Sequence, residues 1–129
     1  MVSPKTFGTA INCMDGRVQL PLIHWMKERY GVDYVDKVTE PGPNRIVATR
    51  TPAELFQSIL NRVTISLEKH GSHRIVIAGH HDCAGNPAPY GEQFQQLKDS
   101  VNVLTDRFPG VEVVAVWIDQ EGTVRPIET

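Results

Sequence analysis

A chain of 129 residues is long enough to bury the core of one domain, and we expect residues 1–129 to form a single one. Hydrophobic residues make up 40% and charged residues 22% of the sequence, as is typical of a globular protein. The formal net charge of −2 argues against a broad basic surface and therefore against nucleic-acid binding, and no segment approaches the roughly 18 consecutive apolar residues that cross a bilayer.

The first residues, MVSPKTFGTA, lack the basic and then apolar layout of a secretion signal. We therefore expect a cytoplasmic protein, in a compartment where thiols stay reduced. The two cysteines of the chain are then expected to be ligands, nucleophiles or core residues rather than a disulfide.

The first third of the chain is expected to contain a strand, a helix and a second strand. Thr6–Asn12 is short and favours β-structure, and it ends at a polar cluster. Leu20–Tyr30 has apolar side chains at helical spacing, and Pro21 is placed to open this helix. Tyr34–Thr39 alternates between apolar and polar residues and is followed by the break Glu-Pro-Gly-Pro.

The remainder begins with a helix over residues 52–67, for which Thr51 is the predicted N-cap and Pro52 the first helical residue. One broad apolar stripe runs along this helix. A near-continuous apolar strand follows, as expected of a strand that is buried on both faces. The later expected elements are the strand Arg74–Ala78, the helix Gln93–Phe108, and the strands Val111–Ile118 and Thr123–Ile127.

Strands that alternate with helices predict an α/β fold with a mostly parallel sheet flanked by helices. Ligands bind such sheets beyond the carboxyl ends of the strands. Cys13 comes just after the first expected strand, and the segment His80–Cys83 comes just after the third. Residues far apart in the sequence are therefore expected to meet at one edge of the sheet.

The residue types at this edge favour a metal site. Cys13, His80 and Cys83 form a plausible set of zinc ligands, and three protein ligands leave the fourth position to water, as in a catalytic zinc site. Asp15 and Arg17 are spaced to pair through a bidentate contact, which would keep the carboxylate ionised and fix its direction.

Each of these residues also has a plain structural interpretation. A buried cysteine is often a small core residue, and an Asp-x-Arg pair is often a surface ion pair of little consequence. His81 and Asp82 are expected to form a solvated loop face. The joint pattern still favours a metal site, because both cysteines fall at the predicted ligand-binding edge. Structural roles are expected for the other histidines, His24, His70 and His73.

The segment Cys13-Met-Asp15-Gly-Arg17, followed by Gly79-His80-x-x-Cys83, resembles the zinc signature of the β-class carbonic anhydrases. The strand RIVIAGH and the ending VWIDQEGTVRPIE are also similar to segments of that family, in the same order. The resemblance covers nearly the whole chain. Each half of the signature alone is weakly specific, and the two together are specific.

The resemblance implies Zn²⁺ on Cys13, His80 and Cys83, with Asp15 and Arg17 as the catalytic pair. The implied reaction is the reversible hydration of CO₂ to bicarbonate by a zinc-bound hydroxide. Asp15 would either orient that hydroxide or occupy the fourth zinc position itself. If Arg17 binds the carboxylate, the fourth zinc position stays free for water. If Arg17 releases it, Asp15 becomes the fourth zinc ligand.

Two further expectations concern proton transfer and assembly. His81, next to a ligand, is suited to carry protons to buffer near neutral pH. The expected partners are the small molecules CO₂ and bicarbonate, with no nucleic acid and no membrane. A homodimer or higher homo-oligomer is also expected, because the apolar helices of so short a chain would bury a face against a second subunit.

The sequence departs from the family pattern in three places. The first expected strand starts within ten residues, whereas family members usually begin with a helical arm that embraces a second subunit. The segments TEPGPNR and CAGNP replace more usual Gly-rich segments. These departures leave open a non-catalytic zinc-binding member of the fold. A hydrolase of a related heterocumulene such as carbonyl sulfide also stays open, as does, less favoured, a redox pair of the two cysteines.

Overall fold

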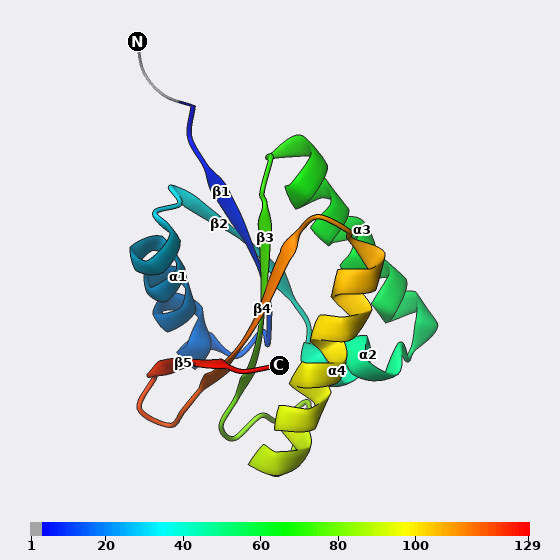
Figure 1. The fold of residues 1–129 in the computed structure, drawn as a ribbon. Helices are drawn as coiled ribbons and strands as arrows, with labels where there is room; N and C mark the ends of the chain where they lie inside the picture. Colours follow the sequence, from blue (N-terminus) through cyan, green and yellow to red (C-terminus); the bar gives the residue numbers. More distant parts are fainter. Residues whose placement is uncertain (1–3) are drawn as a thin grey trace.

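The computed structural model describes residues 4–129, which form a five-stranded sheet with helices on both faces (Figure 1). The strand order is β2-β1-β3-β4-β5, in which the first four strands of the chain are parallel and β5 runs antiparallel to β4. The predicted α/β fold with a mostly parallel sheet is therefore confirmed. The strands are β1 Phe7–Asn12, β2 Tyr34–Thr39, β3 Arg74–His80, β4 Glu112–Ile118 and β5 Val124–Ile127. The helices are α1 Gly16–Tyr30, α2 Pro43–Thr49, α3 Ala53–Lys69 and α4 Tyr90–Arg107.

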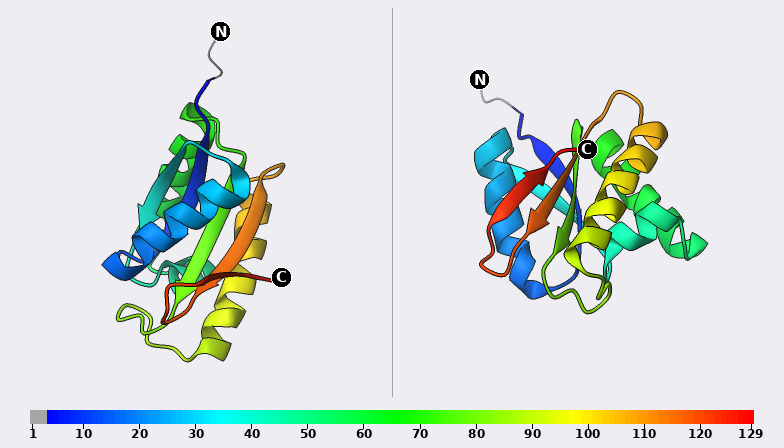
Figure 2. Two further views of the ribbon diagram at one scale, coloured as in Figure 1. Left: turned by 90° about the vertical axis from the view of Figure 1, so that its left-hand side faces the viewer. Right: turned by 60° about the horizontal axis from the view of Figure 1, so that its bottom comes forward.

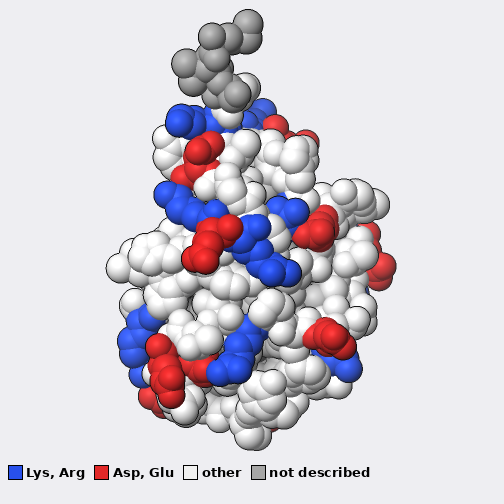
Figure 3. Space-filling view, turned by 60° about the vertical axis from the view of Figure 1, so that its left-hand side comes forward, with Lys and Arg blue, Asp and Glu red and all other residues white. Residues whose placement is uncertain are grey.

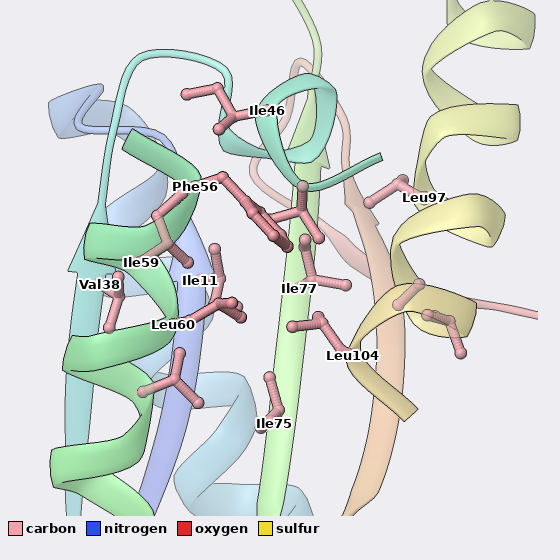
Figure 4. Close-up of a cluster of buried hydrophobic side chains, with 14 residues drawn as sticks. Ile11, Val38, Ile46, Phe56, Ile59, Leu60, Ile75, Ile77, Leu97 and Leu104 are labelled. Carbon is pink, nitrogen blue, oxygen red and sulfur yellow. The ribbon is translucent and has the colours of Figure 1, made fainter. Parts of the chain in front are cut away.

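The sheet separates two apolar cores. Helix α1 covers one face, and α2, α3 and α4 cover the other (Figures 1 and 2). Ile11, Ile75 and Ile77 of the central strands point into the larger core, where they meet side chains of α3 and α4 (Figure 4). Each apolar side chain that is fully buried in this way contributes about 1.5–3 kcal/mol.

Helix α1 begins earlier than predicted. The Asp15 carboxylate accepts a hydrogen bond from the Arg17 N–H at 2.8 Å and caps the helix, which starts at Gly16. The predicted start at Leu20 is therefore wrong, and Pro21 lies inside the helix rather than at its opening. The cap brings Asp15 and Arg17 into the junction between β1 and α1.

Three further differences concern the other helices. Helix α2 was not predicted, because its seven residues begin at the last proline of the Pro/Gly break. Gly42, with a φ of 59°, precedes Pro43 in its first turn. Pro52 occupies the N-cap position of α3, and the hydroxyl of Thr51 bonds to that of Thr49, so the predicted Thr51 cap is wrong. Helix α4 starts at Tyr90, ahead of the predicted Gln93.

The parallel strands end at one edge of the sheet, where the β1–α1 and β3–α4 connections lie at the same end of the molecule (Figure 2). Strand β3 continues to His80, two residues beyond the predicted Ala78. Lys and Arg side chains lie among Asp and Glu side chains on the face that Figure 3 shows. Within residues 4–129, no helix combines the length and the apolar character that crossing a membrane requires.

Candidate metal centre

Three potential metal ligands meet at the carboxyl edge of the sheet. Cys13 follows β1, His80 is the last residue of β3, and Cys83 lies in the loop that follows. One ligand atom of each residue lies within 4.8 Å of the others, and all three residues are buried. The two Sγ atoms are 3.8 Å apart. Two sulfur ligands about 2.3 Å from one tetrahedral zinc ion would be separated by about 3.8 Å, so this spacing fits zinc.

The imidazole of His80 has one nitrogen engaged and one free. Nδ1 lies 2.8 Å from the main-chain carbonyl of His81, which can only accept, so Nδ1 carries the proton. Nε2 therefore presents a lone pair. Among the described residues this buried atom has no hydrogen-bond partner. A buried acceptor without a partner is costly, and a cation between Nε2 and the two sulfurs would satisfy it.

The electrostatics of the thiols also favour a cation. Burial raises the pKa of the Cys83 thiol, and the neighbouring Cys13 raises it further. Two adjacent buried thiolates repel one another unless a positive charge lies between them. Soft thiolates together with an imidazole are donors that zinc prefers. The residues present therefore fit a zinc ion.

Asp15 is held beside this group by the guanidinium of Arg17. Nε and Nη2 of Arg17 donate to the two carboxylate oxygens at 3.1 and 2.7 Å. These hydrogen bonds hold the pKa of Asp15 well below its usual range and raise that of Arg17. The predicted bidentate contact is present, and it favours the ionised form of Asp15.

Arg17 also contacts the second ligand-bearing loop. Its Nη2 donates to the main-chain carbonyl of Asp82 at 3.1 Å, and its Nη1 lies 3.4 Å from the Asp82 carboxylate. Asp82 has a φ of 56°, a left-handed conformation that is uncommon for residues other than glycine. Asp82 is exposed, as a solvated loop face requires, but it also links Arg17 to the loop of His80 and Cys83.

Two hollows flank the candidate ligands. One, of about 430 Å³, is lined by Arg17, His80 and charged residues of the β4–β5 turn. The other, of about 380 Å³, reaches Cys83 between the β3–α4 loop and β4, and its wall contains Pro87, Pro89, Tyr90 and Trp117. His81 is exposed and lines both hollows. His24, His70 and His73 belong to neither of them; His70 instead bonds through Nδ1 to the Asp36 carboxylate at 2.6 Å and stacks on Phe7.

The sequence-based reasoning missed a set of buried amides behind the ligands. Asn44, Asn86 and Gln93 are at most 2% exposed. Gln93 could have indicated them in the sequence. It is a polar residue on the apolar stripe of α4, ahead of Leu97, Val101 and Leu104, where an apolar residue is expected.

Residues 3–128 match the protein family described as "Putative carbonic anhydrase". The chain belongs to this family. The predicted relationship to the carbonic anhydrases is therefore confirmed over almost the entire sequence. Comparison with curated proteins finds no match.

Solved carbonic anhydrase structures share the fold. The chain is similar to the carbonic anhydrase from Glaciozyma antarctica, with a TM-score of 0.63 at 16% identity over 97% of this chain and 85% of that one. It resembles a tetrameric β-carbonic anhydrase from Sordaria macrospora with the same TM-score, at 13% identity over 98% and 83%. The apo form of a carbon disulfide hydrolase also gives 0.63, at 11% identity over 95% and 79%. At these low sequence identities, the similarity shows a shared fold and does not show a shared reaction.

Proposed function

We propose that this chain is a zinc-dependent carbonic anhydrase, which catalyses CO₂ + H₂O ⇌ HCO₃⁻ + H⁺ with the metal on Cys13, His80 and Cys83. The observation that carries the proposal is the convergence of two buried thiols and a free imidazole nitrogen beside an ionised carboxylate. Zinc bound there would supply Lewis acidity, which lowers the pKa of water so that hydroxide, the nucleophile, is available near neutral pH.

The side chains have distinct roles in this proposal. Asp15, ionised and fixed by the fork of Arg17, accepts a hydrogen bond from the attacking oxygen and so directs its lone pair toward CO₂. Both Asp15 oxygens are engaged by Arg17, which supports a role for Asp15 beside the metal rather than among the residues that would hold it. The exposed imidazole of His81 is the group proposed to pass the released proton to buffer.

The proposal is tested by measuring zinc content and then CO₂ hydration by stopped flow. We expect one zinc per chain in the wild type and in Asp15→Asn, and a fall of about 10²-fold or more in turnover for Asp15→Asn. The exposed Asp99→Asn, on α4, is the matched control and should match the wild type. His81→Gln should lower turnover in weak buffer and recover in strong buffer.

Two outcomes would contradict this proposal. A protein that takes up no zinc lacks the centre altogether. A protein that binds zinc but whose turnover is absent, or independent of Asp15, is the non-catalytic zinc-binding member of the fold.

A second candidate reaction is the hydrolysis of a sulfur-containing heterocumulene such as carbonyl sulfide. A carbon disulfide hydrolase shares the fold, and the hollow beside Cys83 has Tyr90 and Trp117 in its wall. The same attack on carbon would release hydrogen sulfide. Comparing sulfide release from carbonyl sulfide with CO₂ hydration decides between the two substrates.

We also propose that the chain acts as a homo-oligomer. The side chains of Met14 and Leu20, beside the candidate ligands and on α1, are each 63% exposed, which is high for large apolar residues. A related enzyme from Sordaria macrospora is tetrameric. Light scattering after size-exclusion chromatography gives the mass directly, and a monomer would contradict this assembly.

A further inference from the structure

Four carboxamide side chains lie together behind the loop that carries His80 and Cys83. We call Asn44, Asn86, Gln93 and Gln96 the amide cluster. The first three are 1%, 1% and 2% exposed, and Gln96 is partly buried. Neither the metal ligands nor the Asp15–Arg17 pair explains why polar side chains occupy these core positions.

Gln93 binds the main chain on both sides of Cys83. Its Nε2 donates to the carbonyl of His80 at 3.3 Å, before Cys83, and to those of Asn86 at 3.3 Å and Ala88 at 3.2 Å, after it. One carboxamide group thus spans the loop from the strand end to the beginning of α4. Three carbonyls share its two protons.

The rest of the amide cluster fixes the direction of Gln93. Its Oε1 accepts from Nδ2 of Asn44 at 3.3 Å, which sets which end of the carboxamide faces the loop. Asn44 also donates to Oε1 of Gln96 at 3.1 Å, and Asn86 donates to the same oxygen at 2.6 Å. Helix α2 therefore supports α4, and both support the loop.

Glycine at position 79 lets these amides pack closely against the strand beneath them. A Cβ at Gly79 would lie 3.1 Å from Oε1 of Gln93 and 3.4 Å from Nδ2 of Asn44. This packing places Gln93 directly against the strand that ends in the ligand His80. Buried amides with every partner in place rigidify the segments that they join.

We propose that Gln93 is a positioning residue for the metal: it fixes the backbone from His80 to Ala88, so that Nε2 of His80 and Sγ of Cys83 point to one centre. This inference rests on the metal binding in the proposed function, and it concerns no atom that touches substrate. Groups that orient metal ligands commonly contribute ten- to hundredfold to metal affinity.

The test measures the affinity of the full chain for zinc, by competition with a chelator, in Gln93→Met. Methionine is unbranched and similar in length to glutamine, and it removes both the donors and the acceptor. We expect zinc affinity to fall ten- to hundredfold and the absorption bands of the Co²⁺-loaded protein to weaken or shift. The control is Gln95→Met on the same helix, where exposed Gln95 bonds only to Asp99 at 3.0 Å, and it should leave both readouts unchanged.

Equal zinc affinity and equal cobalt spectra in Gln93→Met and wild type would overturn the inference. So would a lower melting temperature of the metal-free protein without any change in affinity, which is what a purely structural role predicts. If Gln93→Met does not fold, Gln93→Asn, which withdraws the amide by one methylene, gives the same comparison. A wild type that binds neither metal refutes the proposed function instead, which separates the two failures.

Discussion

Lys37 is a partly buried cation on the α1 side of the sheet. It lies on β2, with Nζ 3.4 Å from the main-chain carbonyl of Gln19. Burial lowers its pKa to about 8. One distant acceptor offsets little of the cost of removing an ammonium group from water.

Replacement of this lysine should therefore stabilise the protein. Between about pH 8 and 10.4 the unfolded chain holds a proton on Lys37 that the folded chain has lost, so the stability of the wild type rises with pH across this range. Lys37→Met removes that rise and, at pH 7, adds on the order of 1 kcal/mol to the free energy of unfolding. Urea unfolding at pH 7 and 10 measures both effects. Equal pH dependence in Lys37→Met and in the exposed control Lys69→Met would contradict the prediction.

At the scale of elements, Gly85 allows the loop after β3 to lie directly against Pro41 in the loop after β2. A Cβ at Gly85 would lie 2.5 Å from Cβ of Pro41 and 2.7 Å from its carbonyl carbon, closer than real Cβ atoms approach. The contact fixes the position of the loop that carries Cys83. In the sequence this segment stands out only as a departure from the family's Gly-rich pattern.

Gly85→Ala should therefore destabilise the protein by about 1–3 kcal/mol, because one of the two loops must move. The control is Gly91→Ala in the first turn of α4, where a Cβ would meet nothing within 4 Å. That change should stabilise the helix by about 0.5–1 kcal/mol. Thermal and urea unfolding of both variants give the comparison, and two substitutions of equal effect would show that the close approach to Pro41 is unimportant.

Local sequence patterns were sufficient to predict the strands and the edge of the sheet at which the candidate metal ligands lie. The carboxyl ends of neighbouring parallel strands must converge, so Cys13 and His80 could be brought together from their positions alone. Helix α2 could not be predicted in this way, because its seven residues begin within a Pro/Gly break. The pairing of Asn44 with Gln93 joins residues 49 positions apart, and no local pattern encodes such a contact.

At the scale of the whole molecule, three carboxylates accept hydrogen bonds at separate places in the fold. Asp15 accepts from Arg17, Asp33 from the main chain of Thr6, and Asp119 from the N–H groups of the β4–β5 turn. In each case hydrogen bonds to the carboxylate lower its pKa.

These shifts predict a loss of stability in acid. The unfolded chain takes up protons on these groups near pH 4, before the folded chain does, so the free energy of unfolding falls as the pH drops below about 4. Asp119→Asn should weaken this fall, while Asp106→Asn on α4 should not. Urea unfolding of the metal-free protein between pH 3 and 6 gives the slopes. Identical slopes for wild type and Asp119→Asn would contradict the assignment to this turn.

The binding of one divalent cation by Cys13, His80 and Cys83 is tested most directly by X-ray absorption at the zinc edge of the reconstituted protein. We predict one zinc per chain with two sulfur ligands at about 2.3 Å, of which one disappears in Cys83→Ser. Zinc surrounded only by nitrogen and oxygen, or no stoichiometric zinc at all, would contradict this site and the reaction proposed for it.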